Sequence, residues 1–216
     1  VNDGSPNIVN FNDYTISTFD PSQDGSGGSP TSATVSPDGS TLEIGNNSWK
    51  KVSVPYTLTA NTVLSLEFRA DSIGEIFGIG FDNDNSIGGG GVNGYQLGGT
   101  QTWSGMDQSF NTYDQGDGWV RFDLPIGTDY TGAMSELVFV LDDDASPTGT
   151  ALFRNVNFYE STDVLSVNEG ATFNITNAHI NSVDVDDTAT GLNFTASNLT
   201  NGHVEVGGVT RDTFTQ

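Results

Sequence analysis

Residues 63–69 read VLSLEFR and residues 119–124 read WVRFDL, and in both stretches apolar and polar side chains alternate. Successive side chains of a β-strand point to opposite faces of the sheet, so this period of two predicts strands with one buried face. Many short strands separated by turns rich in Gly, Pro and Asp predict an all-β fold, a jelly-roll-like β-sandwich. Further strands are expected at 42–44, 52–58, 76–81, 95–97, 137–141 and 152–159.

The charge of the chain excludes several classes of partner. Its 216 residues carry 28 Asp and Glu against 6 Lys and Arg, a formal net charge of −22. Such a surface repels phosphate backbones and anionic lipid, so we expect no nucleic-acid binding. An apolar run of about 18 residues is missing, so we expect no direct membrane insertion. The absence of cysteine excludes disulfide frameworks, thiolate zinc sites and catalytic thiols.

The acidic residues are gathered with Asn, Gly and Ser into short knots. Residues 82–85 read DNDN and residues 142–144 read DDD, each directly after an expected strand. Oxygen ligands this close repel one another unless a hard cation lies among them, and Ca²⁺ takes 6–8 oxygens. We therefore predict several calcium ions, with a solvated turn as the alternative at the first knot. If the two strands are neighbours, one cation site is shared by Asp82, Asp84, Asp142 and Asp144.

Two more acidic segments are candidate calcium sites. The Gly/Ser-rich loop 20–28 contributes Asp20 and Asp24, and the knot at 184–187 contributes Asp184 and Asp186. Weak calcium sites fill at the millimolar concentrations found outside cells. Together with a cysteine-free, Gly-rich composition, this predicts an extracellular protein of a bacterial cell surface.

The segment 98–119, GGTQTWSGMDQSFNTYDQGDGW, has little reason to be buried. Aromatic faces and amides at a loop rim suit sugars or peptides, which makes Gln101 and Trp103 candidate ligand-binding residues. The alternative is that these aromatics fold back and plug the sandwich. Catalysis is poorly supported because His179 and His203 belong to no triad motif, and any carboxylate pair is expected by chance in so acidic a chain. We expect that the protein is not an enzyme.

A change of composition near residue 160 predicts two domains, residues 1–160 and residues 161–216. The second domain contains DVLSVNEGATFNITNAHINSVDVDD (163–187), LNFTASNLTNGHVEV (192–206) and RDTFTQ (211–216). These stretches resemble the first half of a cadherin-like extender repeat from giant bacterial adhesins. The resemblance implies a small or partial β-sandwich repeat with a calcium knot at Asp184 and Asp186.

Residues 14–160 resemble a known extracellular, calcium-dependent β-sandwich module. The resemblance rests on SQDGSGG (22–28), GEIFGIGFDNDN (74–85), YQLGGTQTW (95–103), GWVRFDLPIGTDYTG (118–132), LVFVLDDDA (137–145) and FRNVNFYE (153–160). Similar modules occur as carbohydrate-binding appendages of enzymes and, in RTX-type adhesins, as peptide-binding domains that capture C-terminal ends through calcium. The resemblance implies a pocket lined by Asn85, Tyr95, Gln101 and Trp103.

The cadherin-like second domain favours the adhesin context. We therefore interpret the chain as the ligand-binding module of a large surface adhesin, monomeric within a long multidomain chain. Its expected partner is a peptide C-terminus on a host or neighbouring cell, held at a calcium-assisted loop site. Two alternatives stay open: a carbohydrate-binding module for cell-surface or algal polysaccharide, and a purely structural extender.

Overall fold

The computed structural model describes residues 7–87, 91–161, 193–195, 203–211 and 213–215. The chain separates into two compact units, Val1–Ser161 and Thr162–Gln216. Each unit is described by itself. Within the described residues no helix is long and apolar enough to cross a membrane.

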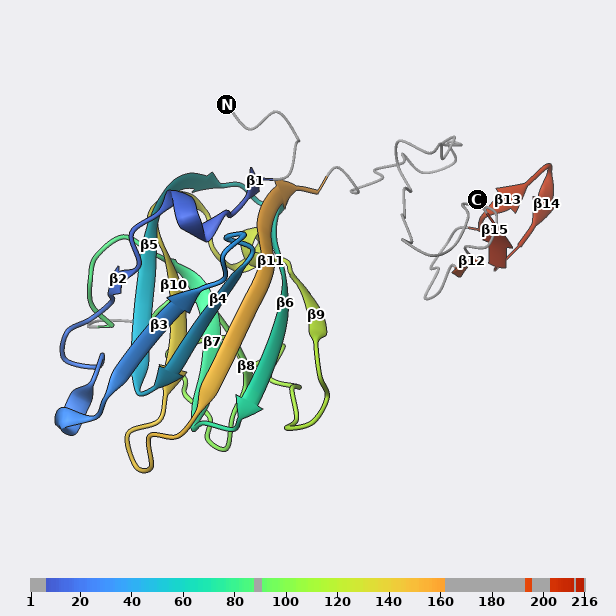
Figure 1. Ribbon diagram of the computed structural model, residues 1–216. Helices are drawn as coiled ribbons and strands as arrows, with labels where there is room; N and C mark the ends of the chain where they lie inside the picture. The colour runs from blue at the N-terminus through green and yellow to red at the C-terminus, as the bar shows by residue number, and fades with distance from the viewer. Residues whose placement is uncertain (1–6, 88–90, 162–192, 196–202, 212, 216) are drawn as a thin grey trace. The chain divides into compact units, whose positions relative to one another are not determined.

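The first unit consists of two antiparallel sheets packed face to face (Figure 1). The first sheet has the strand order β3 (Thr31–Val35), β4 (Thr41–Asn46), β11 (Thr150–Glu160), β6 (Thr62–Ser72) and β9 (Val120–Leu124), and β1 (Asn7–Ile8) also pairs with β11. The second sheet has the order β2 (Ser17–Thr18), β5 (Ser48–Leu58), β10 (Gly132–Asp142), β7 (Ile76–Asp82) and β8 (Asn93–Gly98).

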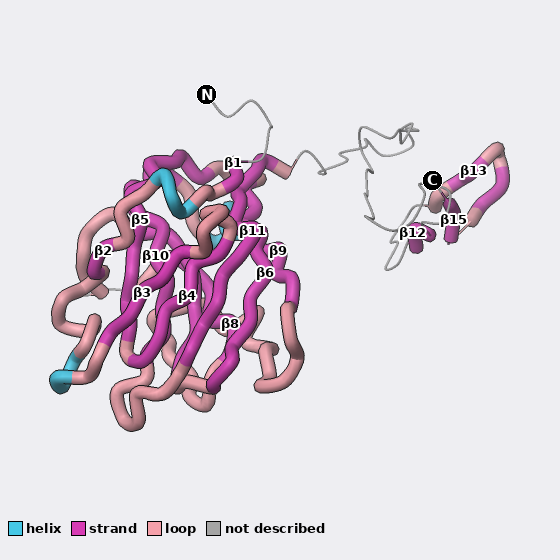
Figure 2. Tube along the Cα trace, viewed as in Figure 1, coloured by secondary structure: helices cyan, strands magenta, loops and turns pink. Residues whose placement is uncertain are grey.

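Among the described residues of this unit, helical structure is confined to single turns in the loops (Figure 2). These turns are η1 (Phe11–Asp13), η2 (Ser26–Gly28) and α1 (Ile126–Asp129). In the second unit the described residues form two antiparallel pairs. One pair is β12 (Asn193–Thr195) with β15 (Thr213–Thr215), and the other is β13 (Glu205–Val206) with β14 (Val209–Thr210).

The core lies between the two sheets and is built by the alternation seen in the sequence. Leu64, Leu66 and Phe68 of β6 are at most 1% exposed, while their neighbours face outward. Phe68 packs on Phe77 of β7 and on Phe153 of β11, with ring centroids 5.3 and 5.2 Å apart. The all-β sandwich prediction is confirmed, and every expected strand lies within one of β4 to β11. Sequence patterns missed β3, which is exposed along most of its length.

Candidate functional site

The outer face of the second sheet is covered by loops. Strand β7 is buried on both faces, because the side chains of Ile87, Val92, Trp103 and Met106 from neighbouring loops cover its outward positions. At Gly78 a Cβ atom would lie 2.4 Å from Sδ of Met106, so only glycine allows this close packing. The covered surface forms a second apolar cluster, separate from the core, of Phe19, Trp49, Ile76, Val92, Met106, Val138 and Val140, with Ile87 and Trp103 partly buried against it.

Gln96 holds the loop 99–108 over this face. Its side chain is 0% exposed, and Nε2 donates to the carbonyl oxygens of Gly98 (3.2 Å) and Gln101 (2.7 Å). Oε1 accepts from the backbone N–H of Trp103 and from Nε2 of Gln108, both at 3.0 Å. All four hydrogen-bonding positions of the amide are therefore used. Sequence reasoning missed Gln96, although a polar residue inside a buried strand is a signal for such a role.

The segment 98–119 is more buried than the sequence predicted. Tyr113 is 4% exposed, packs edge-on against Phe68 of the core, and its hydroxyl accepts from the backbone N–H of Ala70 at 3.0 Å. Met106 is 3% exposed. The alternative, in which the aromatics of this segment fold back, therefore holds for Tyr113, and the expectation of an open loop is wrong for Tyr113 and Met106. Gln101 is exposed and Trp103 is partly exposed.

Four of the predicted site residues lie together at one end of the second sheet. Glu75 connects them: its Oε1 accepts from Nε2 of Gln101, and its Oε2 accepts from the backbone N–H of Asp144 at 3.0 Å. Nε1 of Trp49 lies 3.4 Å from Oδ1 of Asp142. The rings of Trp49 and Trp103 meet edge to face, with centroids 5.5 Å apart and an interplanar angle of 73°. We call this group the Glu75 cluster; its members are Trp49, Glu75, Gln101, Trp103, Asp142 and Asp144.

The Glu75 cluster contains carboxylates that repel one another. Burial is the main cause that raises the pKa of Asp142; the Trp49 hydrogen bond opposes it, and the charges of Asp144 and Glu75 add to the rise. A raised pKa means that the ionised form is under electrostatic strain, which a bound cation relieves. Asp143, by contrast, is 4% exposed and fixes the β10–β11 turn by accepting from the backbone N–H groups of Thr148 and Gly149.

The DNDN knot lies at the opposite end of the second sheet. Oδ1 of Asp82 accepts from the backbone N–H groups of Asn83 (2.6 Å) and Asp84 (3.1 Å), and burial raises the pKa of this carboxyl. Oδ1 of Asp84 accepts from Ser86 at 2.9 Å. Asp84 and Asn85 are exposed. Backbone N–H groups of the loop therefore supply some of the hydrogen bonds that its carboxylate oxygens accept.

Asp20 belongs to the neighbourhood of the same loop. Its Oδ2 accepts from the backbone N–H of Ile87 at 2.8 Å, and its Oδ1 accepts from Oγ of Ser22 at 2.6 Å. Burial acts to raise its pKa, but the hydrogen bonds from Ser22 and Ile87 outweigh burial and lower it. The sequence did not predict this contact between Asp20 and Ile87, which follows the DNDN knot along the chain.

A single cation site shared by the two knots does not form. The two strands are neighbours as expected, but they are antiparallel, so Asp82 lies opposite Glu136 and Asp142 lies opposite Ile76. A strand rises about 3.3 Å per residue, so the two ends of β7 lie roughly 20 Å apart. The prediction of a shared site is therefore wrong.

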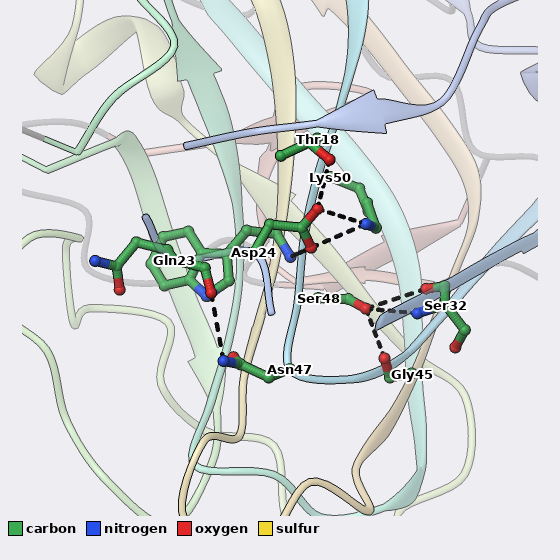
Figure 3. A network of polar contacts seen from close by, with 9 residues as sticks. Thr18, Gln23, Asp24, Ser32, Gly45, Asn47, Ser48 and Lys50 are labelled. Carbon is green, nitrogen blue, oxygen red and sulfur yellow. Dashed lines mark hydrogen bonds and ion pairs between the residues drawn. The ribbon is translucent and has the colours of Figure 1, made fainter. Parts of the chain in front are cut away.

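Asp24 is engaged by a buried lysine (Figure 3). Nζ of Lys50 lies 2.9 Å from Oδ1 and 2.6 Å from Oδ2, and the two side chains are 10% and 3% exposed. Oγ1 of Thr18 donates to Oδ2 at 2.6 Å, and the backbone N–H of Trp49 donates to Oδ1 at 3.0 Å. The ammonium group thus occupies the place that a cation would take, and we leave Asp24 out of the proposed calcium site.

The remaining predicted residues lie elsewhere. Tyr95 is 1% exposed in the core, where its hydroxyl donates to Asp129, so a ligand would not reach its ring. Asp184 and Asp186 lie outside the described residues. Within the part of the chain that the structure describes, no three acidic or histidine side chains gather closely enough to hold a metal ion. The carboxylate and amide oxygens of the Glu75 cluster are of the kind that calcium binds. The loops that carry them would have to move closer together to hold an ion.

Comparisons with known proteins concern the fold. No family model matches the chain, and no curated protein matches it. A family 29 carbohydrate-binding module is 11% identical with a TM-score of 0.35, over 68% of this chain and 88% of that module. A family 4 module is 11% identical with a TM-score of 0.38, over 68% and 86%. A low-affinity xylan-binding module of family 86 from Roseburia intestinalis is 9% identical with a TM-score of 0.37, over 73% and 96%.

Proposed function

We propose that the protein is a non-catalytic glycan-binding module of an extracellular bacterial surface protein, with its ligand site at the Glu75 cluster. The observation that carries the proposal is the convergence of Glu75, Gln101 and Trp103 at one end of the second sheet, beside Asp142 and Asp144. These residues come from three separate loops and strand ends. Carbohydrate-binding modules of similar fold support the glycan over the peptide.

The chemistry of the cluster suits a sugar ring. Trp103 is partly exposed and rests edge-on against Trp49, so its indole is held in place before a ligand arrives. The apolar face of a pyranose packs on such a ring. The exposed amide of Gln101 and the neighbouring carboxylates offer donors and acceptors for hydroxyl groups. The aromatic ring supplies affinity, and the polar groups orient the sugar.

Calcium is part of the proposal. Glu75, Asp142 and Asp144 would hold an ion once their loops close, and Asp82 and Asp84 would take part in holding another at the opposite end of the sheet. Burial and, to a smaller extent, the charges of Asp144 and Glu75 raise the pKa of Asp142, and a bound ion would favour its ionised form. A coordination position left open would accept vicinal hydroxyls.

A peptide C-terminus at the DNDN loop is the second candidate. The exposed side chains of Asp84 and Asn85 favour it, because a calcium ion held there would be accessible to a carboxylate. In this reading the chain is the module of an RTX-type adhesin, and residues 161–216 belong to a cadherin-like extender repeat. Amidation of the peptide would then weaken binding at least tenfold, about 1.4 kcal/mol.

The test is a glycan array and a C-terminal-peptide array, each probed in millimolar calcium and in chelator. We expect calcium-dependent binding to glycans, reduced at least tenfold by Trp103→Ala and by Gln101→Ala. The matched control is Gln115→Ala, which removes an exposed amide from the same segment but outside the Glu75 cluster. Equal binding by Trp103→Ala and the parent would place the ligand elsewhere, and binding to peptides alone would favour the second candidate.

A further inference from the structure

The outer face of the first sheet concentrates basic residues in an acidic protein. Arg69, Arg121 and Arg154 are three of only 6 Lys and Arg in the chain, and all three lie on this face. They come from adjacent strands: Glu67 of β6 lies opposite Arg121 of β9 on one side and opposite Arg154 of β11 on the other. The face was not singled out by any sequence motif.

Each guanidinium on this face is paired with a carboxylate. Arg121 donates from Nε and Nη2 to Asp123, both at 2.9 Å. Nε of Arg154 donates to Oε2 of Glu67 at 2.5 Å, and this hydrogen bond is the main cause that lowers the pKa of Glu67. The third pair joins Arg69 and Asp71. The positive charges are therefore locally compensated.

The Arg69–Asp71 pair has its own geometry. Nη2 of Arg69 donates to Oδ2 of Asp71 at 3.0 Å. Nε lies 2.8 Å from Oδ1, but its N–H is not directed at a hydrogen-bond partner. The hydrogen bond of this pair is therefore made by Nη2 of Arg69 and not by Nε.

Trp119 lies across the middle of this face. It precedes β9, the edge strand that pairs with β6, yet Cζ of Arg154 on β11 lies 4.0 Å from its ring centroid. Cζ of Arg69 lies 4.9 Å from the same centroid. The indole therefore reaches over β6 and is held by two guanidinium groups. Cation–π contacts of this kind fix an aromatic ring that is still partly exposed.

A shallow hollow of about 90 Å³ adjoins the arginines on this face. The strand β11 carries an irregularity between Arg154 and Asn157, and Asn155 within it has a φ of 51°, which turns its side chain toward Glu67. Nδ2 of Asn155 donates to Oε2 of Glu67 at 2.7 Å. The hollow is lined by Ser65, Leu66, Glu67, Arg121, Asn155 and Asn157.

We propose that this face is a second saccharide-binding surface, which takes an uncharged oligosaccharide lying across β9, β6 and β11. The hollow is far smaller than the roughly 300 Å³ of an enclosing pocket, which favours an extended ligand on an open face. The exposed part of the Trp119 indole offers a fixed apolar surface against which a sugar ring can pack. Guanidinium and carboxylate groups in a pair can donate to and accept from neighbouring hydroxyls without separating. This surface is independent of the Glu75 cluster.

The charge pattern selects a neutral ligand. An acidic sugar would have to compete with Asp123, Glu67 or Asp71 for a guanidinium that is already paired. It would also approach a chain with a net charge of −22. A neutral sugar does not compete with the carboxylates for the guanidinium groups and is not repelled by the negative charge of the chain.

The experiment is an NMR titration of the ¹⁵N-labelled protein with cellohexaose, mannohexaose and xylohexaose, and with hexagalacturonate as the acidic comparator. We expect at least one neutral hexasaccharide to bind with a Kd below about 1 mM and to shift amide signals of β6, β9 and β11. Hexagalacturonate should leave these signals unchanged. Trp119→Ala should weaken the binding read from these signals at least tenfold, and Ser104→Ala, at an exposed position in the loop over the other sheet, should leave it unchanged.

Arg121→Gln provides a second variant, because Arg121 is exposed and its loss leaves the core intact. It should weaken binding about fivefold while the spectrum keeps its folded dispersion. The proposal is overturned if none of the neutral hexasaccharides shifts these signals, or if the acidic hexamer binds this face as tightly. It is also overturned if Arg121→Gln and Trp119→Ala, both folded, bind as the parent does.

Discussion

The two outer faces of the sandwich are built on the same alternating strands but differ in what covers them. On the first sheet the face is open, and its carboxylates are paired with arginines. On the second sheet loops fold over an apolar cluster, and carboxylates without arginine partners gather at the strand ends, where burial raises the pKa of Asp82 and Asp142. The comparison teaches that two faces of one fold can differ in charge compensation: the arginines of the first face are paired with carboxylates, and the carboxylates of the Glu75 cluster have no arginine partner among the described residues.

The largest expected effect concerns the buried pair beneath the second face. Lys50→Met would leave the Asp24 carboxylate buried and unpaired, with both side chains at most 10% exposed, and should lower the free energy of unfolding by about 3–5 kcal/mol. The matched control is Lys51→Met. Lys51 pairs with Glu136 at 3.4 Å and should cost about 1 kcal/mol or less. Urea denaturation measures both, and equal losses would show that burial of the pair is not what matters.

The position of the loop 99–108 over the second sheet should depend on the side chain of Gln96. Gln96→Ala would leave the backbone N–H of Trp103 and the carbonyl oxygen of Gln101 without their partner, so we expect a loss of about 2–3 kcal/mol. The exposed Gln115 provides the control, because Gln115→Ala should change stability by less than about 0.5 kcal/mol. Increased protease cleavage within 99–108 should accompany the loss. An unchanged cleavage pattern would contradict the role given to Gln96.

Calcium should stabilise the protein through the carboxylates of the second face. An ion that binds only the native state stabilises it by about 2.7 kcal/mol at a hundredfold excess over Kd. A thermal scan in chelator should therefore show a lower Tm than one in millimolar calcium. Asp142→Asn combined with Asp144→Asn should reduce the difference, whereas Asp123→Asn on the first face should not. Identical midpoints in chelator and calcium would rule out the calcium proposal.

The smallest effect is a difference of sign in the pH dependence of the two faces. The folded-state pKa of Asp142 is raised, so in chelator its contribution favours the native state at low pH and is lost as the pH rises through that pKa. The folded-state pKa of Glu67 is lowered, so its contribution is present above the unfolded pKa and is lost as the pH falls. At pH 7 in chelator, Asp142→Asn should stabilise and Glu67→Gln should destabilise, each by less than about 1 kcal/mol. The same sign for both variants would remove the contrast between the faces.

Much of the fold follows from local pattern. The alternation of Leu64, Leu66 and Phe68 predicted both the strand and its buried face, because the period of two is a property of the extended chain itself. Strand β3 escaped notice because it is an exposed edge strand, where no burial imposes alternation on its Thr, Ser and Ala residues.

What the sequence determined by itself is the all-β fold, the buried faces of its strands and the chemical character of its loops, since each depends on neighbours along the chain. Only the tertiary structure decided which loops meet. Glu75 joins Gln101 and Asp144, Lys50 neutralises Asp24, and Trp119 reaches Arg154 across β6. Antiparallel pairing separated Asp82 from Asp142, although both follow neighbouring strands. Contacts between distant segments depend on strand order and direction, which composition and spacing do not encode.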